Sequence, residues 1–157
     1  MRLLMLLVGK TRNPAWRESL EEYRQRINRY CRCDIRELKE EKPGRNELPV
    51  EFCRRQGPRL LNEFGREPGP KLLLDERGPA WTSREFAVFL EKLLAGGHRN
   101  LIFMCGGAFG YDDSLRRAAD HLVALSPLTF PHELARVLLF EQLYRALTII
   151  RNEPYHY

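Results

Sequence analysis

The chain has 157 residues, of which 43% are hydrophobic and 30% charged, the ordinary composition of one globular domain spanning residues 1–157. No apolar run reaches transmembrane length, and residues 2–8 are too few for a signal peptide, so we expect a cytoplasmic protein without membrane contact. The net charge is +5, and the basic surplus lies in residues 1–66, which hold 16 Lys and Arg against 10 Asp and Glu. This surplus is compatible with a polyanionic partner and equally with a solvated surface.

The first half of the chain predicts two strands and two helices. An apolar run over residues 1–8 predicts a buried strand, and Asn13-Pro14 predicts the start of a helix whose apolar stripe ends at Ile27. Residues 33–38 alternate as a second strand, and residues 49–64 predict a further helix. Because Gly57-Pro58 lies inside that pattern, we expect a kink there or two short helices.

The second half continues the alternation of strands and helices. Strands are predicted over residues 71–75, 100–105 and 121–124, and helices begin near Arg84, over residues 112–120, and at Pro131. The last helix reaches about Arg151. This order predicts an α/β protein with a mostly parallel sheet flanked by helices.

Two loops could bind a ligand. Gly106-Gly107-Ala108-Phe109-Gly110 follows a strand, where glycines allow close approach to the backbone, although such a cluster is more often a tight turn. Residues 125–132 precede a helix N-terminus, where backbone amides can hold an adenosine, a carboxylate or a phosphate. The simpler interpretation of this second loop is capping, with Thr129 bonding to the first turn.

The last helix is apolar on several sides, which indicates a subunit interface as well as a core. On its surface Glu141 and Arg145 are spaced to form an ion pair, so Arg136, near the candidate ligand loop, is the better functional candidate. The aromatic ending Pro154-Tyr155-His156-Tyr157 could stack on a splayed base, although terminal residues are usually without consequence. The four cysteines lack the spacing of a zinc site, and we expect no functional metal.

Together these segments resemble one family over the whole chain. The ordered motifs are residues 8–10, Leu74-Asp75-Glu76-Arg77-Gly78, the glycine loop, residues 125–132, Arg136-Val137-Leu138 with residues 141–146, and Pro154-Tyr155-His156. They are similar to the ribosomal RNA large subunit methyltransferase H family, whose members are SPOUT-class enzymes. The resemblance implies a SPOUT-type α/β fold with a C-terminal trefoil knot, and an obligate homodimer. The implied reaction is S-adenosylmethionine-dependent methylation of N3 of a pseudouridine in large-subunit (23S) rRNA within the assembled ribosome.

The same resemblance assigns roles to single residues. Leu74, Gly106, Leu125, Ser126, Pro127, Leu128, Thr129 and Phe130 match positions that contact the cofactor. His132, Arg136, Tyr155 and His156 match positions on the rRNA side of the pocket, and in a dimer the tail would complete the partner's site. For the proton on N3, His156 is the candidate acceptor; the alternative is that Arg136 stabilises the ionised base without a dedicated acceptor.

Two departures from the family pattern stand out. Tyr157 occupies the place of a terminal basic residue, and Pro58 interrupts a helix that is usually continuous. Two other classes of function stay open: a ribosome- or RNA-binding module of the same fold without catalysis, and an α/β enzyme acting on a small metabolite or nucleotide.

Overall fold

The computed structural model describes residues 1–156, so the expectation for Tyr157 lies outside the described residues. Five parallel strands form one sheet in the order β2-β1-β4-β3-β5. The strands are β1 (Arg2–Val8), β2 (Arg32–Leu38), β3 (Lys71–Leu74), β4 (Asn100–Cys105) and β5 (His121–Val123). The predicted parallel α/β sheet is therefore confirmed.

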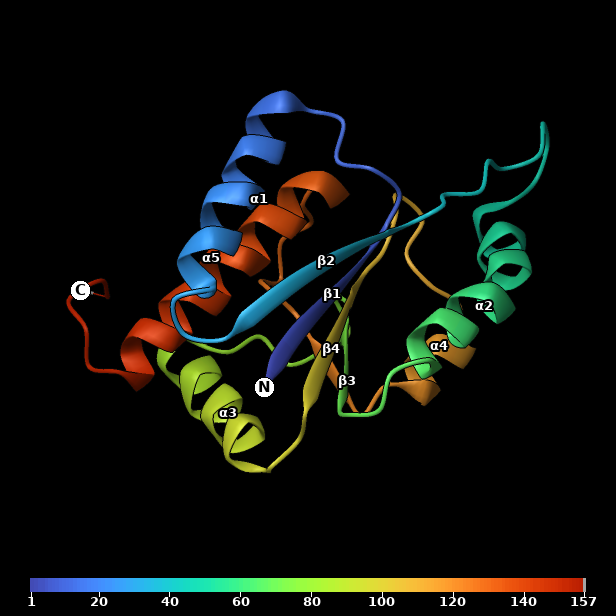
Figure 1. The fold of residues 1–157 in the computed structure, drawn as a ribbon. Helices are drawn as coiled ribbons and strands as arrows, with labels where there is room; N and C mark the ends of the chain where they lie inside the picture. The colour runs from blue at the N-terminus through green and yellow to red at the C-terminus, as the bar shows by residue number, and fades with distance from the viewer. Residues whose placement is uncertain (157) are drawn as a thin grey trace.

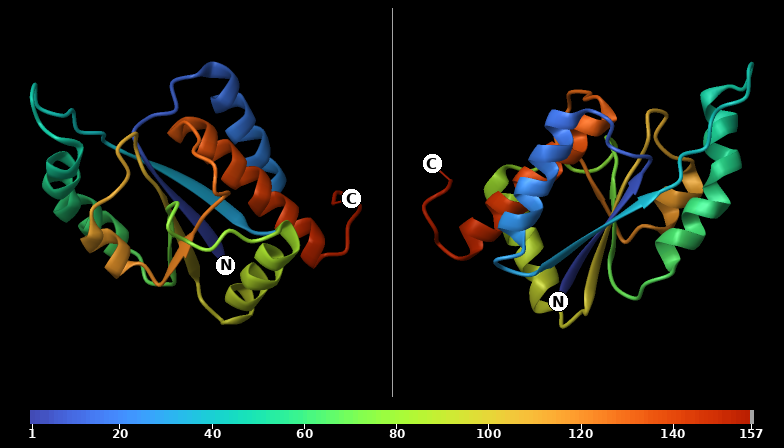
Figure 2. Two further views of the ribbon diagram at one scale, coloured as in Figure 1. Left: turned by 180° about the vertical axis from the view of Figure 1, so that it is seen from behind. Right: turned by 45° about the horizontal axis from the view of Figure 1, so that its top comes forward.

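Helices cover both faces of this sheet (Figure 1). On one face lie α1 (Pro14–Ile27), α3 (Ser83–Ala95) and α5 (His132–Ile150), with α5 in contact with both of the others. On the other face α2 (Pro49–Gly65) contacts the short helix α4 (Asp113–Ala118). The two further views in Figure 2 show the same three layers.

Each face of the sheet has its own apolar core, because successive side chains of a strand point to opposite faces. In β1, Leu3, Met5 and Leu7 pack toward α1, α3 and α5. Leu4, Leu6 and Val8 pack toward α2 and α4. The central strands are thus buried on both sides, as parallel sheets require.

Helix α2 corrects one expectation. Residues 49–65 form one helix that contains Pro58, so the prediction of two short helices is wrong. The Pro58 ring lies on the exposed side, while Phe52, Leu60 and Phe64 bury the opposite side against the core. Packing of this apolar side outweighs the local cost of proline.

The helix N-termini were predicted with mixed success. Asn13 caps α1 as expected, its side-chain oxygen accepting from the Ala15 amide at 3.0 Å. Thr129 does not cap α5: the capping position is Pro131, and no side chain there accepts from the first turn. That prediction is wrong because α5 begins later than the capping interpretation requires.

Within residues 1–156, no helix has the length and apolar character needed to cross a membrane. The same residues contain no cluster of His, Cys, Asp and Glu suited to a metal ion. All four cysteines are free thiols.

Candidate active site

The site lies at the edge of the sheet where β3, β4 and β5 end, because parallel strands bring their carboxyl ends to one edge. The loops that follow these strands line a cavity of about 150 Å³ that opens to solvent. Its lining comprises Leu74, Asp75, Glu76, Cys105, Gly106, Gly107, Gly110, Tyr111, Val123, Ala124, Leu125, Ser126, Leu128, Thr129, Phe130, His132 and Ala135. Residues separated by up to 61 positions in the chain thus surround one space.

The glycine loop forms one wall and allows no side chain at its first position. A Cβ atom added to Gly106 would lie 2.9 Å from Cζ of Tyr111. That ring is buried beneath the loop, and its hydroxyl donates to the Met104 carbonyl at 3.0 Å. Gly110 closes the loop with φ of 72°, a conformation that favours glycine. The loop therefore exposes backbone to the cavity in a fixed position.

Residues 125–130 form the opposite wall. All of the cofactor positions predicted in this loop line the cavity except Pro127. The Ser126 hydroxyl accepts from the Leu128 amide at 3.0 Å and so holds the loop in a turn. Leu128 stands at the rim with 72% of its surface exposed, an apolar side chain available to a ligand.

The third wall is acidic, and although its segment is one of the family motifs, no role was predicted for its two carboxylates. Asp75 is buried, and its carboxylate accepts from Arg116 Nε at 2.8 Å and from the Arg77 amide at 2.9 Å. Glu76 beside it lines the cavity from an exposed position. Both carboxylates follow directly after strand β3, and this placement is the signal in the sequence that could have identified them as residues of the site. Apolar walls with an acidic edge suit a ligand that combines an aromatic ring with positive charge.

His132, the first residue of α5, also lines the cavity. Burial and the positive charge of Arg136 lower the pKa of its imidazole below the ordinary value. The ring is therefore uncharged at neutral pH and able to accept a proton or a hydrogen bond. Glu133, the next residue, instead binds the amides of Arg12 and Asn13, each at 3.1 Å.

Arg136 lies in a different place from the one expected for an RNA contact. Its side chain is fully buried, 0% exposed, one helical turn beyond His132. The guanidinium donates to the carbonyls of Val8 at 2.5 Å and Gly9 at 3.1 Å, and to the Thr11 hydroxyl at 3.1 Å. In this arrangement Arg136 holds the end of β1 and touches no exposed surface, so the structure does not support direct contact with a base.

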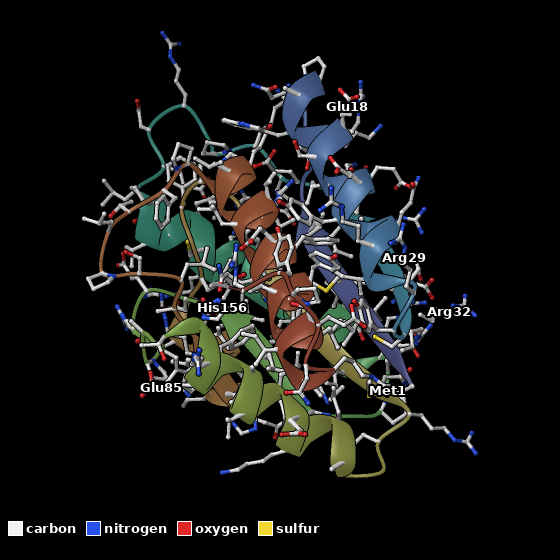
Figure 3. All side chains as sticks on the ribbon, turned by 90° about the vertical axis from the view of Figure 1, so that its left-hand side faces the viewer. Met1, Glu18, Arg29, Arg32, Glu85 and His156 are labelled. Atoms are coloured by element: carbon white, nitrogen blue, oxygen red, sulfur yellow. The ribbon has the colours of Figure 1, made fainter. Side chains whose placement is uncertain are left out.

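The tail lies far from the cavity of its own chain. The Tyr155 ring packs against Tyr144 with centroids 4.7 Å apart, and its hydroxyl donates to Glu141 at 3.2 Å. His156 Nδ1 is 3.4 Å from Arg145 Nη1, and Figure 3 shows this residue in front of α5. Arg145 lies thirteen residues along α5 from His132, about 20 Å at the rise of an α-helix. The tail and the cavity residues therefore do not meet within one chain.

The predicted ion pair on α5 is confirmed. Arg145 donates to Glu141 from Nη2 at 2.5 Å and from Nε at 2.9 Å. Glu141 thus joins Arg145 and the Tyr155 hydroxyl in one polar cluster on the outer side of the helix.

Comparisons with known proteins agree with this architecture. A family model described as predicted SPOUT methyltransferase matches residues 1–156. The chain is 44% identical over 157 residues to ribosomal RNA large subunit methyltransferase H of Geotalea daltonii, with all of both chains covered. It is 41% identical over 158 residues to the protein of that name in Geobacter sulfurreducens, again covering both completely. The corresponding protein of Nitratidesulfovibrio vulgaris is 42% identical, with all of this chain and 99% of the relative covered.

Proposed function

The chain belongs to the SPOUT methyltransferase family, and from this premise we propose that it methylates N3 of a pseudouridine in large-subunit rRNA. The proposal includes S-adenosylmethionine as methyl donor, the assembled ribosome as substrate, and a cytoplasmic homodimer as the active form. One observation carries it: the cavity at the carboxyl edge of the sheet gathers Leu74, Gly106 and five of the six predicted cofactor positions in residues 125–130.

We propose further that residues 1–157 fold as one domain and that its C-terminal part is tied in a trefoil knot. The support for the knot is the family membership and the path of the chain after β5. From this edge strand the chain returns to place α5 between α1 and α3.

The cavity fits S-adenosylmethionine by the chemistry of its walls. Leu74, Leu128 and Phe130 offer apolar surface to an adenine ring, and the exposed backbone of the two loops offers hydrogen bonds. The exposed carboxylate of Glu76 lies on the side that would offset positive charge on the ligand, whereas that of Asp75 is already paired with Arg116. When bound, this cofactor supplies an electrophilic methyl group on a sulfonium.

The chain's own residues would then position the base and take its proton. His132 is uncharged at neutral pH, lines the cavity, and is suited to hydrogen-bond the base. Arg136 fixes the end of β1 beneath the cavity, so we assign it a positioning role in place of direct contact. For the proton on N3 we retain His156, contributed by the tail of a second subunit, as the acceptor. His156→Ala should then lower the methylation rate more than it lowers cofactor affinity.

The test is mass spectrometry of rRNA from a bacterium in which the gene is deleted. We expect one methylated pseudouridine of the large subunit to disappear, and to return when the purified protein and S-adenosylmethionine are added to the mutant ribosomes. Leu128→Arg is the control, since it places a positive charge at the rim of the cavity and should restore nothing. If every methylated pseudouridine persists in the deletion strain, the assignment fails.

Calorimetry separates the proposal from a non-catalytic RNA-binding module. We expect S-adenosylmethionine to bind the wild-type protein and to bind Leu128→Arg more weakly. A protein that binds ribosomes but gives no heat with the cofactor would belong to the second class.

A further inference from the structure

We propose that a groove leading from the cavity across Phe109 to the cleft between α2 and α4 binds single-stranded rRNA beside the target nucleotide. The proposal rests on the proposed function, because it names the surface that would hold the substrate. It concerns the face of the sheet opposite α5, which is formed by α2 and α4 in Figure 1.

The groove is continuous with the candidate active site. A second hollow of about 400 Å³ shares Leu74, Gly107 and His132 with the cofactor cavity. The same hollow shares Phe109, Tyr111 and Arg116 with a third hollow of about 510 Å³, which extends between α2 and α4. A strand whose target base enters the cavity can therefore continue across the glycine loop without leaving the protein surface.

Phe109 is built as a platform for stacking. Its side chain is 45% exposed, although it stands beside two hollows. The rings of Phe52 and Phe109 pack edge to face with centroids 5.3 Å apart. The backbone carbonyl of Phe109 accepts a hydrogen bond from Cys53 Sγ at 3.2 Å. An exposed aromatic ring whose backbone and edge are fixed loses little freedom when a base stacks on it.

The charges beyond Phe109 suit a phosphate backbone. Arg54 and Arg117 line the third hollow in exposed positions, and within residues 1–156 neither forms an ion pair or a side-chain hydrogen bond. The acidic residues beside them are engaged: Asp113 pairs with Arg77 and Arg116, and Asp112 caps α4. Two uncommitted guanidinium groups therefore face the groove.

These features favour RNA over a protein partner. The exposed surface combines one aromatic ring and the small apolar pair Pro49 and Val50 with arginines, whereas a protein interface of useful affinity needs a larger apolar centre. Grooves that bind single-stranded nucleic acid combine aromatic residues, on which bases stack, with separate basic residues that follow the phosphate backbone.

The experiment compares the binding of the variants to assembled ribosomes from a strain lacking the gene. Phe109→Ala should weaken binding about tenfold, and Phe109→Trp should restore it. Arg54→Glu with Arg117→Glu should raise KM and lower the slope of log affinity against log salt by about 1.4, the share of two single-strand phosphates. Lys92→Glu with Arg99→Glu is the matched control, because it changes the net charge by the same amount at two exposed positions. Lys92 lies in the last turn of α3, as Arg117 lies in the last turn of α4.

The outcomes separate this inference from the proposed function. Calorimetry with S-adenosylmethionine must give wild-type affinity for the groove variants, which shows that they are folded. If wild-type protein methylates and the groove variants bind and methylate as it does, the groove inference is overturned while the function stands. If wild-type protein binds assembled ribosomes without methylating them, and the groove variants alone weaken binding, the groove stands and the function fails. Weakened binding of the arginine double variant with an unchanged salt slope would indicate a contact other than phosphate and overturn the inference.

Discussion

At the scale of single residues, Arg136 is a charged side chain in a fully buried position. Within residues 1–156 no carboxylate forms an ion pair with it; its partners are the Val8 and Gly9 carbonyls and the Thr11 hydroxyl. Val8 is the last residue of β1, and Gly9 and Thr11 follow it, so one guanidinium joins the start of α5 to the end of β1. Such a side chain stabilises the wall of the cavity from behind.

Arg136→Lys should lower the free energy of unfolding by about 1–3 kcal/mol, because an ammonium on a flexible stem cannot reach all three acceptors. Urea denaturation measures the change, and Arg99→Lys, an exposed site, should stay within about 0.5 kcal/mol of wild type. A variant with unchanged stability and a reduced methylation rate would contradict the positioning role and indicate contact with the substrate.

His132 should make the free energy of unfolding depend on pH in a range where the carboxylates do not titrate. Its pKa in the folded protein is lowered by burial and by Arg136, so between that value and the unfolded pKa of about 6.5 the unfolded chain binds the extra proton. Its contribution is therefore complete above about pH 6.5 and is lost as the pH falls through the lowered pKa.

His132→Gln should flatten the decline of the free energy of unfolding between about pH 7 and 5, measured by urea denaturation at a series of pH values. Carboxylates with unfolded pKa values near 4.3 titrate below this window. Equal slopes in the wild-type protein and in His132→Gln would show that His132 is not the group responsible.

At the scale of elements, α2 holds two residues that disfavour helices, and they differ in their surroundings. Pro58 is exposed, and it leaves the carbonyl one turn earlier without its helical donor. Gly57 is buried, and a Cβ there would lie 2.8 Å from Asp112 Oδ2, the carboxylate that caps α4. In α2, therefore, Pro58 can be replaced, whereas Gly57 is required by the close approach of α4.

Pro58→Ala should raise the free energy of unfolding by about 1–2 kcal/mol, since the regained hydrogen bond exceeds the entropy that proline removes from the unfolded chain. Gly57→Ala should lower it, although alanine is the better helix former, because the added methyl group displaces the Asp112 carboxylate. Thermal unfolding of both variants measures the two signs. A stabilised Gly57→Ala protein would mean that α4 can shift without cost.

The elements could be predicted from the sequence where their signals are local. Asn13 and Thr82 cap α1 and α3 through neighbouring amides, and alternation or apolar runs identify the strands. The cap of α5 could not be assigned in this way, because Pro131 takes the position that Thr129 was expected to hold. Continuity of α2 through Pro58 also depends on packing against distant residues.

The candidate site shows the same division. Most of the predicted cofactor positions line one cavity because parallel strands bring the motifs that follow them to one edge. The burial of Arg136 could not be predicted from the sequence, since its partner Val8 is 128 positions away in the chain. Nor could the sequence reveal that Tyr111 supports the glycine loop from below or that Asp75 is held by Arg116.

At the scale of the whole molecule, α5 has an outer side that one chain leaves partly open. Leu134, Leu138 and Ile149 are only half-buried there, and the tail folds along the same helix. The cavity lies at the start of α5 and His156 beside Arg145, about 20 Å further along the helix. If His156 acts on the bound base, it must therefore come from another copy, and a two-fold dimer would supply two such composite sites.

This arrangement predicts complementation between two inactive proteins. Leu128→Arg should lose cofactor binding but keep a competent tail, and His156→Ala should keep the cavity but lack the proton acceptor. After the two are unfolded together and refolded, half of the dimers are mixed, and each mixed dimer contains one intact site. The recovered methylation should reach about a quarter of the wild-type rate. Each protein refolded alone should stay inactive, and a double mutant mixed with His156→Ala should recover nothing. If the tail served its own chain, every site in the mixed dimer would carry one defect, and no activity would return.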